Sequence, residues 1–493
     1  MGSSILLLAS VVSALGGLVF GYELGIISGA LLQLQAEFRL SCVQQEALVS
    51  SLLIGALLAS IAGGRVIDRH GRRNSILLSN VLILSGSLVL LIGSYPALVA
   101  GRITVGFAMC ISSMSCCIFV SEMVTPDRRG FLVTLYEAGI TVGILAAYAM
   151  NYFLSDSKRG WKWMFGLAVA PTLIQLVSIW FLPAGSNRSL SPGEPRSTIE
   201  NQEADEVQYN NAYLFQRKDN MRTRTVIGLG LVLFQQFTGQ PNVLFYASTI
   251  FRSVGFRSNA SAVLASVGLG LVKVFTTLTS MVLSDRVGRR PLLISGCSVM
   301  AMCLIAIGLL SGHSLTSAKT HCHSEDLEVN RTDLPHLAAG NQLVFDTPFD
   351  ESQRPLRNNT QDDGVLVGQS DGPLASPPGA HGTVVNWIIL LCMMAVVSAY
   401  SVGFGPMTWL LLSEIFPAAV RGRAFAFINC FNWAANLLVT FTFLNCTDLI
   451  GLSGMFLLYG TSAVAAAVFF YFMLPETKGK TLEEIDQELR FNR

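Results

Sequence analysis

The sequence is divided into long apolar segments that are separated by short clusters of charge. A membrane-spanning helix needs about 20 mostly apolar residues, and the 493-residue chain contains twelve segments of that kind. They lie at 7–31, 46–67, 74–94, 98–121, 131–153, 162–182, 224–251, 260–283, 290–312, 384–412, 424–444 and 449–474. Runs such as residues 75–91 do not alternate polar and apolar residues as barrel strands do. We therefore expect an all-α membrane protein with twelve transmembrane helices in a lipid bilayer.

Composition excludes several other classes of protein. Charged residues make up 13% of the chain, against about 25% in soluble domains. A net charge of +1 offers no electrostatic attraction for nucleic acid. The sequence has no metal-ligand spacing, nucleophile elbow or phosphate-binding glycine loop. We expect neither an enzyme nor a protein with a cofactor or a bound metal.

The short loops place their basic residues on one side of the membrane. Arginines occur in every second loop between apolar segments, at 68–73, 127–129, 285–290 and 421–423. Loops that are rich in Lys and Arg stay in the cytosol. This predicts cytosolic termini and four regions. They are an N-terminal six-helix half (1–183), a cytosolic linker (184–223), a C-terminal six-helix half (224–474) and a cytosolic tail (475–493).

On the opposite side we expect a long loop at 313–383, whose Asp, Asn, Pro and Gly content predicts disorder. Glycosylation sequons begin at Asn330 and Asn358 in this loop and at Asn259 on the same face, and we expect at least one to be used. Cys42, Cys322 and Cys446 map to that face too. A Cys42–Cys446 disulfide would join the two halves, and the sequence leaves open whether it forms.

Two motifs occur once in each half. Asp-Arg-x-Gly-Arg-Arg lies at 68–73 and at 285–290, and Ser-Glu followed by an arginine seven residues after the glutamate lies at 121–129 and at 413–421. The halves are therefore parallel repeats. Basic side chains alone would be enough to fix the orientation of the chain in the membrane. The Asp and Glu residues that accompany them predict a network of charge-assisted hydrogen bonds at the cytosolic helix ends. Its candidate members are Asp68, Arg72, Arg73, Glu122, Arg129, Asp285, Arg289, Arg290, Glu414 and Arg421.

Six ordered motifs together resemble the sugar porters of the major facilitator superfamily. Besides the two repeated motifs, they are Gly-Arg at 101–102, Gln-Gln-x-Thr-Gly at 235–239, Gly-Pro-x-x-Trp at 405–409 and Pro-Glu-Thr-Lys-Gly at 475–479. Residues 21–29 and the 313–383 loop are similar to class III facilitative glucose transporters. The resemblance implies a monomer with the major facilitator fold that carries hexoses such as D-glucose, and also galactose or dehydroascorbate. It implies endoplasmic reticulum, perinuclear or plasma membranes as its location.

A sugar presents hydroxyls that both donate and accept, so its site needs carboxamides and an aromatic face. The resemblance places sugar contacts at Gln235, Gln236, Trp409 and Asn432, with Asn436 on the same helix face as Asn432. The alternative is that these amides only join helices to one another. Glycines and a proline at 403–406 predict a break in the tenth span, which is either an inert kink or a hinge that moves the tryptophan.

Three residues depart from the family pattern in or near the site. Glu137 stands where a sugar-contacting Gln is usual, Lys273 stands where an Asn is usual, and Asn242 is displaced by one position, with Pro241 at its site. An ionisable group near the bilayer centre costs about 2.5–3.5 kcal/mol on insertion scales. We hypothesise that Glu137 and Lys273, from opposite halves, face each other and pair.

Glu23 and Arg102 form a second candidate pair within the membrane. The resemblance aligns Glu23 with the proton-carrying acid of sugar/proton symporters, and Arg102 with the arginine that accompanies it. The pair is either a static lock between the first and fourth spans or a proton-coupling site, because desolvation and the cation act in opposite directions on the carboxylate. A non-transporting sugar receptor is a third alternative, against which the repeated cytosolic motifs argue.

Overall fold

The computed structural model describes residues 3–123, 126–181, 214–216, 218–254, 258–314, 380–480 and 482–491. Within some of these helices the description does not extend to every side chain. The sequons at Asn330 and Asn358, together with Cys322, lie outside the described residues. Asn259 is the first residue of a helix, and its side chain is not among those described.

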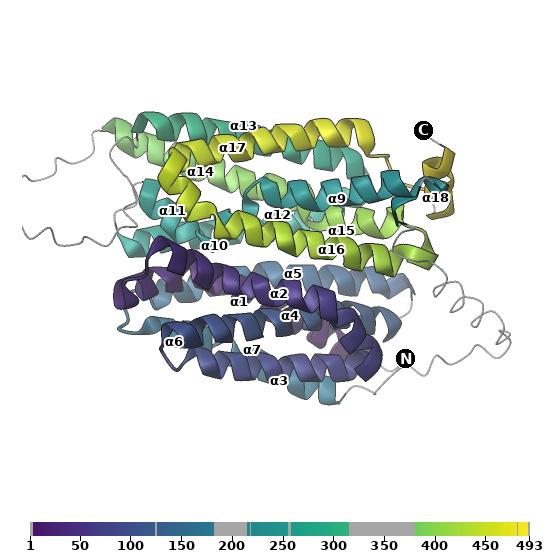
Figure 1. The fold of residues 1–493 in the computed structure, drawn as a ribbon, viewed down its shortest axis with the longest axis horizontal. Helices are drawn as coiled ribbons and strands as arrows, with labels where there is room; N and C mark the ends of the chain where they lie inside the picture. The colour runs from purple at the N-terminus through teal and green to yellow at the C-terminus, as the bar shows by residue number, and fades with distance from the viewer. Residues whose placement is uncertain are drawn as a thin grey trace, which may run out of the picture.

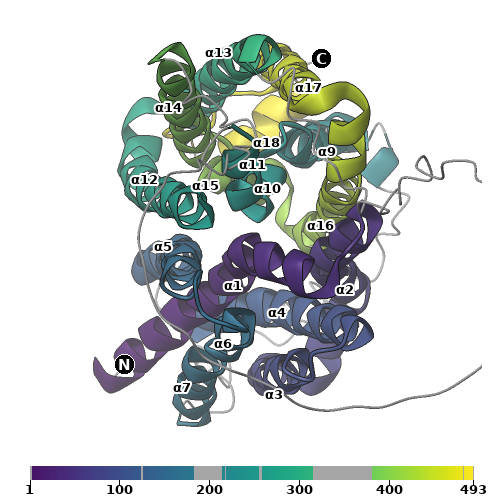
Figure 2. The same ribbon diagram turned by 90° about the vertical axis from the view of Figure 1, so that its left-hand side faces the viewer.

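The N-terminal half is a bundle of helices (Figures 1 and 2). They are α1 (Ser3–Phe38), α2 (Cys42–His70), α3 (Arg72–Leu90), α4 (Tyr95–Met123), α5 (Pro126–Phe153), α6 (Gly160–Gly166) and α7 (Val169–Trp180). The short α6 and the longer α7 together occupy the predicted span 162–182.

The C-terminal half forms a second bundle, and Figure 2 shows the two lying one above the other. After the short turn η2 (Lys218–Asn220) its helices are α9 (Met221–Phe237), α10 (Gln240–Phe245), α11 (Ala247–Val254), α12 (Asn259–Val287), α13 (Arg289–Ser314), α14 (Ala380–Val402), α15 (Phe404–Ile415), α16 (Ala418–Phe441) and α17 (Phe443–Met473). The amphipathic helix α18 (Leu482–Phe491) follows at one end. The described residues contain helices and no strand, so the all-α prediction is confirmed.

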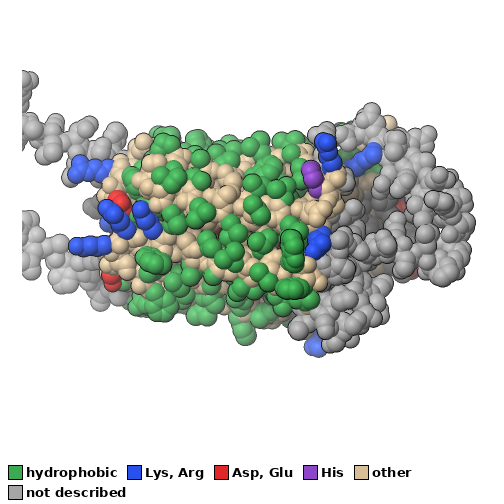
Figure 3. Space-filling view, turned by 90° about the horizontal axis from the view of Figure 1, so that it is seen from below, with side chains coloured by type: hydrophobic (Ala, Val, Ile, Leu, Met, Phe, Trp, Pro, Cys, Tyr) green, Lys and Arg blue, Asp and Glu red, His purple; other side chains and the backbone are tan. Residues whose placement is uncertain are grey.

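The outer surface of the bundle is apolar. Large side chains such as Phe275, Met302 and Phe472 are 74%, 63% and 77% exposed, and Figure 3 shows hydrophobic side chains along the body with charged ones near its two ends. Ten described helices or helix runs are long and apolar enough to cross a membrane. Each predicted segment coincides with one helix or one broken run. The runs 126–153 and 221–254 are not among those ten, so the number twelve stays a prediction.

The repeated Asp-Arg-x-Gly-Arg-Arg motif makes the same turn in both halves. Gly71 joins α2 to α3 with φ 79°, and Gly288 joins α12 to α13 with φ 109°. These angles lie in the region that L side chains rarely adopt, which explains the glycine at this place in the motif. We call the end of the bundle that carries α18, Gly71 and Gly288 the tail end. The opposite end, which carries Ser41 and Thr442, is the far end.

The two halves are joined by hydrogen bonds at the far end. Ser28 of α1 lies 3.1 Å from Ser248 of α11, hydroxyl to hydroxyl, and the Tyr148 hydroxyl of α5 donates to the Leu244 carbonyl at 2.8 Å. In Figure 2, α1, α2 and α5 lie beside α16, α11 and α12 at this end. The described structure is therefore closed there.

The cysteines at the far end do not form the bridge that was considered. Cys42 takes part in a disulfide, but Cys446 is a free, half-buried thiol. A Cys42–Cys446 link is thus absent, and the halves are joined here by polar contacts. Cys446 is the fourth residue of α17, inside that helix, where it packs against the apolar core.

Candidate substrate-binding site

A break in the seventh span sets the position of two glutamines. Helix α9 ends directly after Gln235 and Gln236, and Gly239 adopts φ 77° before α10 begins. A Cβ atom on Gly239 would overlap the ring of Tyr459. The prediction of one uninterrupted helix over 224–251 is wrong in this respect, because a left-handed glycine and Pro241 in the first turn of α10 start a new helix.

The two glutamines and Asn432 form a buried carboxamide cluster. The Gln236 Nε2 donates to Asn432 Oδ1 at 2.6 Å, which links α9 to α16. The Gln235 Nε2 donates to the Phe404 carbonyl at 3.3 Å. These three amide side chains are 3–5% exposed, and the Oε1 atoms of Gln235 and Gln236 have no hydrogen-bond partner in the described part of the chain. Two acceptors are thus buried without a donor.

The tenth span is broken at Gly403, as the sequence predicts. Helix α14 ends at Val402 and α15 begins at Phe404, with Gly403 at φ −90° and ψ −85°. The Phe404 carbonyl that accepts from Gln235 thus lies in the first turn of α15. Trp409 lies one turn later in α15, half-buried, with its ring centroid 5.4 Å from that of Phe425 in α16. Helix α15 therefore carries both the aromatic ring of Trp409 and the carbonyl of Phe404 that accepts from Gln235 of α9.

Two other predicted amides are engaged in helix packing. Asn242 donates its Nδ2 to the Tyr459 hydroxyl at 2.6 Å and to the Val439 carbonyl at 3.0 Å. Asn436 Oδ1 accepts from the Thr440 hydroxyl at 3.1 Å, one turn along the same helix. Asn242, which is displaced by one position from the family pattern, thus joins α10 to α16 and α17. A direct contact of either residue with sugar stays a prediction.

The structure brings Glu137 and Lys273 together across the halves. Lys273, 7% exposed in α12, places its Nζ 5.4 Å from the ring centroid of Tyr400 in α14. Glu137 in α5 interacts electrostatically with both Lys273 and Tyr400. The two charges are not within the 4.0 Å of a direct ion pair. The two charges therefore lie near enough to influence each other without a direct ion pair, and their pairing stays a prediction.

Tyr400 is a member of this cluster that the sequence reasoning missed. Its hydroxyl lies beside the Gln235 amide, so it connects the charged residues to the carboxamides. The one sequence feature that could have identified Tyr400 is its position three residues before Gly403, close to the end of α14. An aromatic residue in a hydrophobic span gives no other indication that it faces a polar site.

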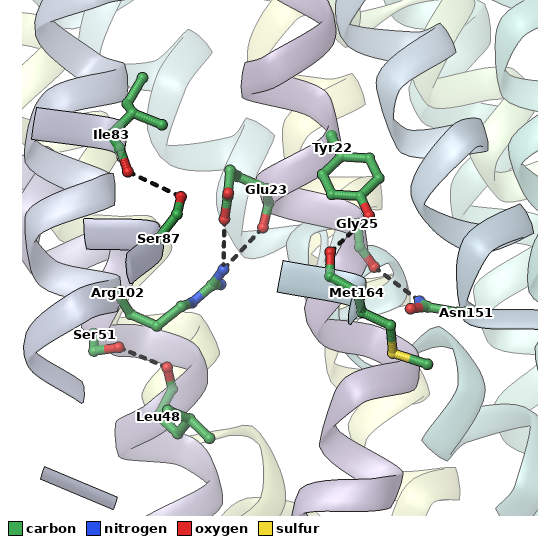
Figure 4. Close-up of polar contacts among 10 residues, drawn as sticks. All are labelled: Tyr22, Glu23, Gly25, Leu48, Ser51, Ile83, Ser87, Arg102, Asn151 and Met164. Atoms are coloured by element: carbon green, nitrogen blue, oxygen red, sulfur yellow. Dashed lines mark hydrogen bonds and ion pairs between the residues drawn. The ribbon is translucent and has the colours of Figure 1, made fainter. Parts of the chain in front are cut away.

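Glu23 and Arg102 form an ion pair that is completely buried (Figure 4). The Arg102 Nη1 lies 3.3 Å from Glu23 Oε2 and also donates to the main-chain carbonyl of Glu23 at 3.0 Å, and both side chains are 0% exposed. The guanidinium carbon lies 5.9 Å from the ring centroid of Phe165. Next to the pair, the Tyr22 hydroxyl donates to the Met164 carbonyl at 2.7 Å. Bonds of this kind fix α1 to α4 and α6.

The expected charge network is present in the C-terminal half at the tail end. Arg289 Nη2 lies 3.5 Å from Glu414 Oε1, and Glu476 accepts from the main-chain N–H groups of Arg289 and Arg290 at 3.2 and 3.3 Å. Glu476 belongs to the Pro-Glu-Thr-Lys-Gly motif and was not predicted as a member. Its reach back to the start of α13 is a long-range contact that a sequence pattern does not reveal.

In the N-terminal half only one candidate of this network is described through its side chain. Arg73 donates to the carbonyls of Ile179 and Trp180 at 3.2 and 2.8 Å, at the end of α7. The remaining candidates in both halves have side chains outside the described part of the structure. They are Asp68, Arg72, Glu122, Arg129, Asp285 and Arg421.

Comparison with known proteins shows the family to which the chain belongs. Residues 9–323 and 373–489 match the family model described as "Sugar (and other) transporter". The chain is 56% identical to facilitated glucose transporter member 10 of solute carrier family 2 from Danio rerio, over 99% of this chain and 93% of that protein. Its identity to the Homo sapiens member 10 is 50%, over 100% of this chain and 95% of the relative.

The fold is also similar to that of a solved transporter structure. A crystal structure of a D-xylose–proton symporter superposes with a TM-score of 0.70 at 27% sequence identity, covering 97% of this chain and 100% of that one. The resemblance read from the motifs is thereby confirmed, as is the major facilitator fold. The chain is a multi-pass membrane protein and not an enzyme, and it belongs to the sugar transporter family.

Proposed function

We propose that this protein carries hexoses, with D-glucose as the main substrate, down their concentration gradient by alternating access. The observation that supports this most directly is that the buried side-chain carbonyl oxygens of Gln235 and Gln236 have no hydrogen-bond partner among the described residues. A buried acceptor without a donor costs roughly 1–3 kcal/mol, and the hydroxyls of a sugar supply donors of the required kind. Trp409, carried on α15, offers the apolar face for the sugar ring.

Two charged residues adjust which hexose is preferred. Glu137 and Lys273 replace neutral amides of the family pattern, so one side of the site has an acceptor of full negative charge and the other a donor of full positive charge. A ring hydroxyl that bridges them receives charge-assisted hydrogen bonds, which are about twice as strong as neutral ones. Galactose and dehydroascorbate are the first alternatives to compare with glucose, because they present similar arrays of polar groups.

Transport without proton coupling agrees best with the state of Glu23. Its carboxylate is bound to Arg102, which also holds the main-chain carbonyl of Glu23. This double attachment is what a static lock between α1 and α4 requires. The relatives named above are called facilitated transporters. We therefore do not propose proton symport through Glu23. Sugar uptake driven by an imposed proton gradient would be the evidence for it.

The tail end is taken as the cytosolic end, because the arginine-rich turns lie there. In this orientation the far-end hydrogen bonds between the halves lie on the non-cytosolic side, which supports a state whose site is closed toward that side. We further propose that the sequons at Asn330 and Asn358 face the non-cytosolic compartment. Glycosidase treatment of the protein in sealed vesicles, with and without detergent, tests that sidedness through the change in gel mobility.

Counterflow in proteoliposomes tests the mechanism. Vesicles loaded with unlabelled D-glucose should accumulate labelled D-glucose transiently from outside, because the internal unlabelled sugar competes with the label for the inward-facing site and delays its exit. Trp409→Leu should reduce the rate of labelled uptake at equal protein content. A control substitution at the lipid-facing Phe275, Phe275→Leu, should leave it unchanged. Labelled uptake that is insensitive to the internal sugar would argue against alternating access.

A further inference from the structure

Helix α17 begins without a cap of its own. Its first residues follow Thr442, whose backbone is already helical and whose hydroxyl donates backward to the Leu438 carbonyl at 2.8 Å. A helix start leaves its first N–H groups without partners inside the helix. The turn between α16 and α17 therefore needs an acceptor from elsewhere in the molecule.

That acceptor comes from the other half of the protein. Glu46, in the first turns of α2, accepts from the main-chain N–H of Asn445 at 2.8 Å and from its side-chain amide, and it also interacts with the N–H of Leu444. Glu46 is 0% exposed. A carboxylate at a helix start is favoured both by the N–H groups and by the helix dipole.

The position of this contact gives it a role in the transport cycle. It lies at the far end, where the halves must separate if the site is to open to the non-cytosolic side. The other cross-half hydrogen bonds there, Ser28–Ser248 and Tyr148–Leu244, join neutral groups. Opening the far end therefore removes an acidic cap from α17 and transfers Glu46 from a buried site to water.

We propose that Glu46 is the residue of the N-terminal half that holds the non-cytosolic gate closed, by capping α17 of the C-terminal half. The proposal rests on alternating access, but it concerns the equilibrium between two conformations and not the identity of the sugar. Since hydrogen bonds to a charged group are about twice as strong as neutral ones, Glu46→Gln should shift this equilibrium toward the open far end by roughly tenfold.

Distances between spin labels test the proposal on the full chain in nanodiscs without sugar. One pair, Tyr152→Cys with Arg252→Cys, spans the halves at the far end on a side away from Glu46. A second pair, His70→Cys with Gly422→Cys, spans them at the tail end. All four positions are exposed. With Glu46→Gln the far-end pair should move to longer distances and the tail-end pair to shorter ones.

Glu37→Gln is the matched control. Glu37 is also a carboxylate near the far end, but it accepts from Trp161 Nε1 at 2.6 Å within the N-terminal half, so its removal should leave both distance distributions unchanged. Asn445→Ala keeps the main-chain N–H and should shift the distances in the same direction as Glu46→Gln, by a smaller amount. If the Glu46→Gln protein fails to fold, the distances measured in Asn445→Ala test the proposal.

Transport gives an independent measurement of the same shift. With Glu46→Gln, the ratio of the KM for sugar at the cytosolic face to the KM at the other face should rise, because a larger population presents its site outward. Unchanged distances at both label pairs in Glu46→Gln and Asn445→Ala would overturn the proposal. Because no sugar is present in the distance measurement, that result would leave the proposed substrate and its site untouched.

Discussion

Gln236 of α9 and Asn432 of α16 are joined by a 2.6 Å hydrogen bond from Nε2 to Oδ1. The bond fixes the orientation of the Gln236 amide, and its buried Oε1 has no partner within the part of the chain that the structure describes. Neighbouring Gln235 is oriented in a comparable way by the Phe404 carbonyl. These helix-to-helix contacts orient the same side chains that we propose recognise the substrate, so the two readings of the amides do not exclude each other.

A double-mutant cycle on this pair should detect both functions. Gln236→Ala and Asn432→Ala should each weaken D-glucose binding, and the double variant should lose less than the sum of the two. The hydrogen bond that orients Gln236 is absent in either single variant, so we expect a coupling energy of about 0.5–1.5 kcal/mol. Binding measured by intrinsic tryptophan fluorescence provides the values. Strictly additive losses would show that the orientation of the amide is irrelevant to the sugar.

Glu137 and Lys273 should compensate for each other. Glu137→Gln and Lys273→Asn each leave one buried charge without its counterpart, so each should lower the transport rate and the thermal stability. The double variant restores the neutral pair of the family pattern and should recover most of both. Initial rates of uptake and melting temperature in detergent are the measurements. Losses that add up in the double variant would refute the pairing of these two charges.

Gly239→Ala should destabilise the C-terminal half. A methyl group at this position overlaps the Tyr459 ring, and φ 77° is strained for any residue with a Cβ. We expect a loss of at least about 1 kcal/mol and a lower melting temperature. Gly422→Ala is the matched control, because a Cβ there meets nothing within 4 Å. Equal melting temperatures for the two variants would contradict the close approach of α9–α10 to α17.

Glu23→Gln distinguishes a static lock from a proton site. Removing one partner of a buried ion pair costs about 3–5 kcal/mol, so the melting temperature should fall clearly. Downhill glucose flux per folded molecule should persist at temperatures well below melting. Uptake at a series of external pH values, compared between the variant and the parent protein, is the readout. A parent pH dependence that disappears in the variant, without loss of stability, would identify Glu23 as a proton carrier.

The sequence predicted the fold well because a bilayer constrains it so strongly. Every predicted apolar segment coincides with a helix or a broken run of helices, and the motif glycines Gly71 and Gly288 occupy turns that need positive φ. The break after Gln236 was missed. Gly239 is needed both for its φ of 77° and for the approach of Tyr459, which lies more than 200 residues away, and neither feature is visible in the local sequence.

The sequence predicted the amide side chains of the candidate site, but not the contacts that they and their neighbours make. Carboxamides in a membrane span are rare enough to be noticed, so Gln235, Gln236 and Asn432 were identified together. Tyr400 and Glu476 were not, because their roles depend on contacts between distant segments. Asn242 was read from its displacement in a motif, and the structure engages it with Tyr459 instead. Which partner a polar side chain selects is decided by packing, which local sequence does not encode.

Net D-glucose uptake by the purified protein in liposomes tests the central claim most directly. Labelled D-glucose should enter until its internal and external concentrations are equal, L-glucose should not enter, and an imposed proton gradient should change neither end point. Gln235→Ala combined with Gln236→Ala should reduce the initial rate to that of empty liposomes. Accumulation of D-glucose above the external concentration when the outside is acidified, or equal entry of both enantiomers, would contradict facilitated hexose transport through this site.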